Sequence, residues 1–188
     1  PDKLSQNRHS LAHLLAMAVL EFDPKAKLGV GPVIDDGFYY DFALTKSISP
    51  EDLPGLEARM KELASQNLSY KREEINLDEG RLLFKDQPFK TELLEDLSKA
   101  NQELSTYVSG EFTDLCRGGH VGNTSELNLE AFKLDRIAGA YWKGDESREM
   151  LTRIYGLAFE SKEELEEYEA RRIEAQKRDH RKLGKELD

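Results

Sequence analysis

Helical and β-type apolar patterns come in groups along this chain, and this grouping is the feature that most restricts its fold. Apolar residues recur at helical spacing from Leu11 to Phe22, and the pattern ends near Asp23 and Pro24. Two β-rich runs, 28–34 and 38–44, then flank Asp35-Asp36-Gly37, which is typical of a hairpin turn because glycine tolerates positive φ. We therefore expect a helix followed by two antiparallel strands.

The later segments continue the same mixture. Ser49 and Pro50 have the composition of a helix start, and the apolar spacing continues to Leu63. Further patterns predict a strand over 69–77, helices over 79–84 and 91–100 with a break at Pro88, and strands over 104–116, 132–142 and 150–159, the first of them interrupted by Gly110. A capping box at 161–164 opens a last, highly charged helix that runs towards Gly184.

Together these elements predict an α+β fold in which one mostly antiparallel β-sheet packs against helices as a two-layer sandwich. Helices that stand between strand pairs argue against a doubly wound parallel sheet, because there a helix follows every strand. We expect one domain over residues 1–160. Residues 161–188 carry only a thin apolar stripe and are predicted to form a long C-terminal connecting helix.

Composition excludes several classes of protein. Hydrophobic residues make up 38% of the 188 positions and charged residues 34%, and no apolar run reaches the ~20 residues of a membrane span. The first residues lack the pattern of a secretory signal, and a single cysteine excludes an internal disulfide, which suits the cytoplasm. A net charge of -10 argues against nonspecific nucleic-acid binding. The start at Pro1 without a methionine leads us to expect a segment of a longer chain.

Three of the four histidines and the only cysteine form two pairs spaced four residues apart. His9 and His13 belong to the first predicted helix, where residues four apart share a face. Cys116 and His120 enclose two glycines, which let the backbone turn sharply after a strand. We therefore expect three imidazoles and one thiol to meet between a helix and a loop.

Three interpretations of this cluster compete. The histidines could be ordinary polar groups near a helix start, with a buried cysteine below them. The cluster could be a zinc site, because zinc accepts one thiolate and three imidazoles in tetrahedral geometry. It could also be a metal-free hydrolytic site in which neutral imidazoles position and deprotonate a water. The residue pattern alone leaves all three open.

Several stretches in one order resemble the second N-terminal domain of threonyl-tRNA synthetases, which is an editing domain. They are HSLAHLL (9–15), GPVIDDGFYYD (31–41), DLCRGGHV (114–121), AGAYWKGD (138–145), RIYG (153–156) and KRDHRKLGKELD (177–188). The last stretch resembles the linker that enters the synthetase catalytic domain, which this chain lacks. Where bacterial threonyl enzymes usually have proline, this chain has Gly119, and the related editing domain of alanyl-tRNA synthetases carries Cys-Gly-Gly-Thr-His at this place.

The resemblance implies hydrolytic editing of tRNA(Thr) that carries serine by mistake. One missing methyl group changes binding by only about 1–3 kcal/mol, so a second site has to remove the error. The implied partners are the tRNA acceptor end bearing serine and the rest of the synthetase chain, with no membrane. The implied catalytic residues are His9, His13, Cys116, His120 and Lys90, and the implied substrate-binding residues are Tyr40, Asp114 and Arg117.

Within this implied site, His9 and His13 would orient the attacking water or the terminal adenosine, and Cys116 and His120 would close the opposite wall. Asp114 would accept the ammonium group of the substrate, and a desolvated Lys90 would stabilise the oxyanion. Tyr40 shares strand parity with two phenylalanines, so core packing is an equal alternative for it. The Arg117 side chain either faces solvent or binds a phosphate.

The two related groups of enzymes imply different answers on whether the cluster binds a metal. Alanine-specific relatives bind zinc with the four residues of the cluster, whereas the threonyl editing site is generally taken to work without it, and we expect no metal here. Two alternatives to the editing domain stay open at this stage. One is a free-standing trans-editing deacylase of the alanyl type, and the other is a structural zinc module that only grips tRNA or a protein partner.

Overall fold

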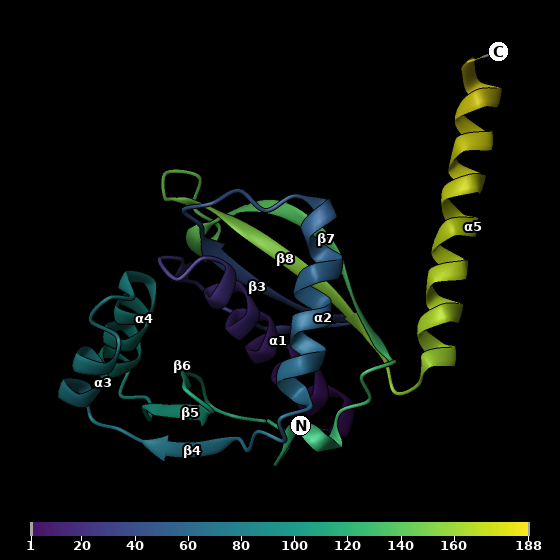
Figure 1. Ribbon diagram of the computed structural model, residues 1–188. Helices are drawn as coiled ribbons and strands as arrows, with labels where there is room; N and C mark the ends of the chain where they lie inside the picture. The colour runs from purple at the N-terminus through teal and green to yellow at the C-terminus, as the bar shows by residue number, and fades with distance from the viewer. Residues whose placement is uncertain (1, 188) are drawn as a thin grey trace.

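The computed structural model describes residues 2–187, with side chains up to residue 184, and shows two antiparallel sheets with helices packed around them (Figure 1). The helices are α1 (Lys3–Phe22), α2 (Leu53–Ala64), α3 (Leu77–Leu83), α4 (Pro88–Lys99) and α5 (Lys162–Leu187). The strands are β1 (Lys27–Leu28), β2 (Val33–Ile34), β3 (Gly37–Ala43), β4 (Lys71–Glu74), β5 (Ser105–Ser109), β6 (Phe112–Leu115), β7 (Phe132–Tyr141) and β8 (Met150–Ala158). The predicted α+β class is confirmed.

The larger sheet has the strand order β1-β3-β8-β7, and β2 also pairs with β3. The expected hairpin is present, since Ile34 lies opposite Gly37 across the turn. Phe38, Tyr40 and Phe42 alternate along β3 and are completely buried. They belong to the main core together with residues of α1 and α2, so these two helices form the second layer over this face of the sheet.

The smaller sheet has the strand order β4-β5-β6, so the prediction of a single sheet is wrong. All four residues of β4 are exposed, which is compatible with the edge of a small sheet and not with the interior of a large one. The predicted interruption at Gly110 is the turn between β5 and β6, where glycine has φ of 59°. Helices α3 and α4 cover this part of the chain through a separate cluster of Phe84, Leu94, Leu104 and Leu115.

Helix α1 begins earlier than its apolar pattern indicates, because Asp2 caps it by accepting a hydrogen bond of 2.8 Å from the Ser5 N–H. The helix therefore includes both His9 and His13, as expected. It packs against α2 and β3 on one side. On another side it meets residues that lead into and form the smaller sheet, including Tyr70 and Phe112. A helix that is apolar nearly all round is placed between the two sheets.

Two further segments differ from or extend the sequence-based predictions. Pro88 is the first residue of α4 and does not lie in a break, because a proline in the first turn needs no N–H partner. The last helix, α5, is anchored at its start by Leu165 and by the ion pair of Arg172 with Asp135. Its remainder projects away from the body (Figure 1).

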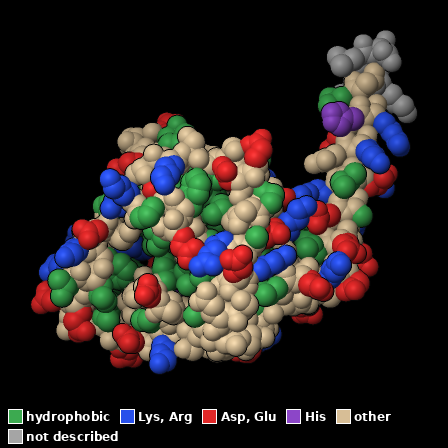
Figure 2. Space-filling model, in the orientation of Figure 1, with side chains coloured by type: hydrophobic (Ala, Val, Ile, Leu, Met, Phe, Trp, Pro, Cys, Tyr) green, Lys and Arg blue, Asp and Glu red, His purple; other side chains and the backbone are tan. Residues whose placement is uncertain are grey.

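The predicted division into a domain over 1–160 and a helix over 161–188 stays a prediction. The two ends of these segments, Pro1 and Asp188, lie outside the described residues. Within residues 2–187, no helix is long and apolar enough to cross a membrane. Figure 2 shows acidic and basic side chains intermixed on the face in view, without a continuous basic surface there.

Candidate functional site

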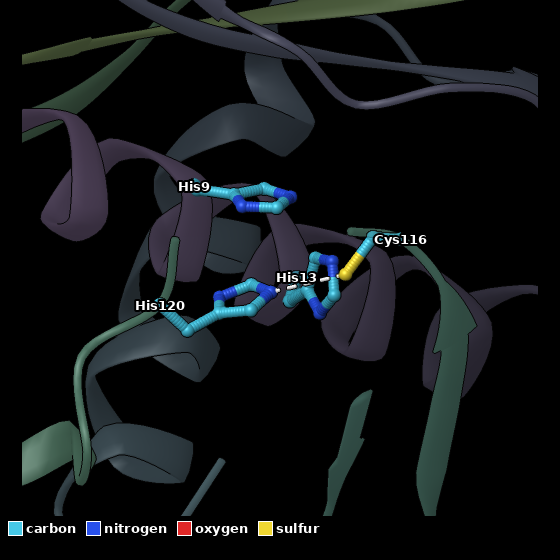
Figure 3. A group of neighbouring side chains, drawn as sticks. All are labelled: His9, His13, Cys116 and His120. Atoms are coloured by element: carbon cyan, nitrogen blue, oxygen red, sulfur yellow. Dashed lines mark hydrogen bonds between the residues drawn. The ribbon is translucent and has the colours of Figure 1, made fainter. Parts of the chain in front are cut away.

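The four side chains of the two sequence pairs meet at one point, as Figure 3 shows. One potential ligand atom from each of His9, His13, Cys116 and His120 lies within 4.8 Å of the others. His13 is 1% exposed and forms the base of the cluster, whereas the other three side chains are partly exposed. The cluster can therefore be reached from solvent, and Cys116 is partly exposed where the interpretation of ordinary polar groups had a buried cysteine.

The two helix histidines use one ring nitrogen each for contacts outside the cluster. His9 Nδ1 lies 3.1 Å from the Gly118 carbonyl oxygen, which can only accept, so Nδ1 carries the hydrogen and Nε2 is left unprotonated. His13 Nε2 lies 3.3 Å from Oδ2 of Asp114, and His13 Nδ1 is buried without a protein hydrogen-bond partner among the described residues. Each ring therefore keeps one free lone pair in the neutral state.

The loop after β6 brings the second pair back towards α1. Gly118 and Gly119 have φ of 111° and 86°, values that side chains other than glycine rarely adopt. A Cβ on Gly118 would also lie 2.5 Å from the hydroxyl of Tyr107. The resulting turn places His120 Nε2 at 3.4 Å from Cys116 Sγ, so the predicted approach of thiol and imidazole is present.

A buried charged network lies directly beneath the cluster and is centred on Asp114. Lys90 Nζ is 2.7 Å from Oδ1, and the Tyr40 hydroxyl donates to Oδ2 at 2.7 Å. Asp114 and Lys90 are each 2% exposed, and Tyr40 is 0% exposed. An unpaired charge at this depth would be very unfavourable, so the lysine and the carboxylate stabilise each other.

Burial sets the protonation states in the cluster. Desolvation lowers the pKa of His9 and of His120, and it lowers the pKa of His13 well below the ordinary value, with His9 and Lys90 adding to the last effect. All three imidazoles are therefore neutral at neutral pH. Burial, followed by the charge of Asp114, raises the pKa of Cys116 to about 12, so its thiol is protonated.

The other predicted site residues fall into two groups. Tyr40 belongs to the core and to the site at once, because its ring stacks on Phe42 while its hydroxyl reaches Asp114. Asp114 lies at the cluster but is already surrounded by three protein side chains, and its contact with a substrate ammonium stays a prediction. The guanidinium of Arg117 is exposed and donates to Gln102 at 2.9 Å, away from the four central side chains.

Sequence analysis missed Ser10 and Tyr70. The Ser10 hydroxyl lies 3.0 Å from His120 Nδ1, and the Tyr70 ring is stacked on the His120 ring with centroids 4.7 Å apart. The position of Ser10 between the two helix histidines was a usable signal. Tyr70 lies in a segment without any local motif, and only the tertiary structure brings it to the site.

The donor set fits zinc as well as a metal-free arrangement. Three imidazoles and one thiol are zinc ligands, and each imidazole has its other nitrogen beside an oxygen of Gly118, Asp114 or Ser10, as zinc-bound histidines do. The partnerless Nδ1 of His13 agrees with either a water or a metal. Zinc binding would have to release the proton of the Cys116 thiol.

Comparison with known proteins shows which family the chain is similar to. Residues 104–155 match the family described as "Threonyl and Alanyl tRNA synthetase second additional domain". The chain is 57% identical over 181 residues to a threonine–tRNA ligase of Dehalococcoides mccartyi, an alignment that covers 96% of this chain and 30% of that protein. It is 53% identical over 189 residues to the threonine–tRNA ligase of Legionella pneumophila, covering 100% of this chain and 29% of that protein. The chain thus spans less than a third of the length of these relatives.

Proposed function

This chain belongs to the family of the second additional domain of threonyl and alanyl tRNA synthetases, and from that premise we propose that it hydrolyses serine from wrongly charged tRNA(Thr). The observation that carries the proposal is the convergence of His9, His13, Cys116 and His120 within 4.8 Å at a partly exposed position. Neutral imidazoles at such a position can orient and deprotonate a water. The reaction is ester hydrolysis, with that water as nucleophile.

His9 is the best placed general base. Its Nδ1–H is held by the Gly118 carbonyl, so Nε2 is free to accept a proton from the water as it attacks the ester carbon. The bond between the carbonyl carbon and the terminal ribose oxygen then breaks, and the ribose oxygen leaves with the proton that His9 took from the water. Serine is released as a carboxylic acid. Because the Cys116 thiol is protonated at neutral pH, we assign it a place in the pocket wall and not the role of nucleophile.

Lys90 is the proposed source of positive charge for the oxyanion that forms during the attack. Its ammonium group is buried and held 2.7 Å from Asp114, a preorganised charge of the kind that stabilises developing negative charge in a dry site. Tyr40 and His13 complete the support of Asp114. The carboxylate has about four acceptor lone pairs and three protein neighbours, so Oδ1 keeps acceptor capacity for the proposed contact with the substrate ammonium.

The substrate follows from the family and from the chemistry of discrimination. The proposed ligand is the 3′ end of tRNA(Thr) carrying serine, with threonine excluded by its extra methyl group. The net charge of -10 makes wide contact with RNA on this chain alone unfavourable, so the remainder of a synthetase chain is proposed as the part that holds most of the tRNA. We propose that the activity belongs to protein synthesis in the cytoplasm.

Zinc is the second arrangement that the site supports. If bound, it would be held by His9, His13, Cys116 and His120 and would supply a Lewis acid to the pocket. We propose hydrolysis without metal, as the resemblance to threonyl editing sites implies, and zinc binding would also have to release the proton of the Cys116 thiol.

The decisive experiment is a deacylation assay with seryl-tRNA(Thr) and threonyl-tRNA(Thr) side by side. We expect the wild-type chain to release serine and to spare threonine, and His9→Ala and His13→Ala to lose serine release by roughly 10²-fold or more. His180→Ala is the matched control, since this histidine is exposed on α5. Equal rates for wild type and His9→Ala would contradict the proposal, and preference for seryl-tRNA(Ala) would favour a deacylase of the alanyl type. A chain that binds tRNA but releases no serine would be a binding module.

A further inference from the structure

Beyond the groups assigned to the reaction, the surroundings of His120 contain a set of contacts that the proposed function does not use. His120 follows two glycines with positive φ, so the backbone of its loop does little to fix the ring. The ring is nevertheless enclosed by a stack on His9, with centroids 4.0 Å apart and planes 18° apart, and a stack on Tyr70, with planes 6° apart. These two neighbours determine the plane of the ring.

The hydrogen bonds of Ser10 determine which ring nitrogen carries the proton. Ser10 is completely buried, and its Oγ accepts the Val121 N–H at 3.1 Å. Among the described residues, the remaining partner of this hydroxyl is His120 Nδ1 at 3.0 Å. A buried hydroxyl hydrogen needs an acceptor, and Nδ1 is the one within reach. The neutral ring therefore has its own hydrogen on Nε2, which lies 3.4 Å from Cys116 Sγ.

We propose that Ser10 is a positioning residue that holds His120 as the Nε2–H tautomer, while Tyr70 clamps the plane of the ring. The inference rests on the proposed function for its consequence, which is a division of labour between two stacked imidazoles. His9 presents an unprotonated Nε2 and accepts a proton, and His120 presents an N–H and donates a hydrogen bond. The site thus has one acceptor and one donor that are fixed by contacts outside the pocket.

The backbone also links Ser10 to Tyr70. The Tyr70 hydroxyl donates to the Ser10 carbonyl oxygen at 3.0 Å, and the Tyr70 N–H donates to the Gly122 carbonyl at 3.1 Å. The segment around Tyr70 is therefore attached both to α1 and to the residues just after His120. Both parts of the proposed support are therefore attached to the helix that carries His9.

The tautomer can be measured without any substrate. The chain has only four histidines, so two-bond correlation spectra of ¹⁵N-labelled imidazoles can be assigned with single histidine variants. At about pH 8, above the usual histidine pKa, we expect the His120 ring to show a protonated Nε2 and an unprotonated Nδ1. In Ser10→Ala the pattern is expected to move towards the mixture of tautomers of a free histidine. A protonated Nδ1 in the wild-type protein would overturn the inference.

Kinetics give the second measurement. We expect Ser10→Ala to reduce kcat for serine release by about tenfold to 10²-fold with little change in KM, because it disturbs orientation and not binding. Ser10→Thr keeps the hydroxyl and is expected to recover most of the rate. Thr124→Val is the matched control, since Thr124 is almost equally buried and its hydroxyl also has two partners, the Leu68 N–H and the Ala64 carbonyl, away from the site.

The outcomes separate this inference from the proposed function. If the wild-type chain releases no serine, the proposed function fails, and the tautomer measurement still tests Ser10. If the chain releases serine but Ser10→Ala loses no more activity than Thr124→Val and keeps the wild-type tautomer, the role of Ser10 is disproved. A loss of rate that Ser10→Thr does not recover, with an unchanged tautomer, would likewise count against it.

Discussion

Replacing Asp114 with asparagine should destabilise the protein far more than the loss of an ordinary ion pair. The substitution removes the counter-charge of Lys90, which is 2% exposed and has its carboxylate partner at 2.7 Å. Leaving one member of a buried ion pair without its partner costs about 3–5 kcal/mol, a large part of the roughly 5–15 kcal/mol of a typical domain. For a chain of this length we expect the melting temperature to fall by about 6–20 °C.

The assay is urea or thermal unfolding of four proteins: wild type, Asp114→Asn, Lys90→Met and the double variant. Because the double variant has no uncompensated charge, it should recover about 2 kcal/mol or more relative to the sum of the single losses. It should nevertheless stay inactive, which separates the structural role of the pair from its chemical role. Lys3→Met is the comparison, since Lys3 and its partner Glu126 are 54% and 41% exposed and such a pair contributes less than about 1 kcal/mol.

Two results would refute this reasoning. One is an Asp114→Asn variant that is no less stable than Lys3→Met. The other is strict additivity of the two single losses in the double variant. Either would mean that the ammonium group and the carboxylate do not depend on each other in the folded protein.

Three further predictions concern acid stability, the loop and metal. Hydrogen bonds from Arg148 and Lys143 lower the pKa of Glu92 to about 2. The stabilising contribution of the Glu92 carboxylate is therefore complete above pH ~4.5 and is lost as the pH falls towards 2. In unfolding titrations, the difference in stability between wild type and Glu92→Gln should shrink over that range. Gly118→Ala should lower stability by about 1–3 kcal/mol and displace His120, whereas Gly144→Ala, where glycine has φ of 69° and open space for a Cβ, should affect stability alone. Chelator treatment should leave serine release unchanged, and activity that needs added zinc would reverse the preference for a metal-free site.

The central cluster was predictable because both pairs follow local rules. A spacing of four places His9 and His13 on one helix face, and the two glycines after Cys116 permit the loop that returns His120. Apolar periodicity likewise located the α-helices and the longer strands, although α1 begins before its pattern and the run predicted over 28–34 consists of two short strands, β1 and β2. These features depend on neighbours in the sequence, which is the information that a pattern contains.

The features that the sequence did not predict depend on contacts between segments that are distant in the chain. The division into two sheets arises because β4, β5 and β6 pair with one another and, within residues 2–187, not with the strands of the larger sheet. Nothing in the short, polar sequence of β4 specifies its partner. Ser10 and Tyr70 reach His120 across 110 and 50 positions of chain. Lys90 was found through family resemblance and not through its pattern, since a single lysine on a helix is usually solvated.

The division into two sheets also explains why the site lies where it does. His9 and His13 come from α1, which packs under the larger sheet, whereas Asp114 and Cys116 come from the end of the smaller one. Tyr40 lies on the core face of β3, and its hydroxyl donates to the Asp114 carboxylate on β6. This hydrogen bond links the larger sheet directly to the smaller one. A helix that was apolar on one side only could not pack against both sheets, and its polar face would then be exposed to water. Burial of α1 on both sides is therefore what lowers the pKa of its histidines and keeps them neutral, so that in the proposed reaction His9 retains an unprotonated Nε2 with which to accept a proton from the attacking water.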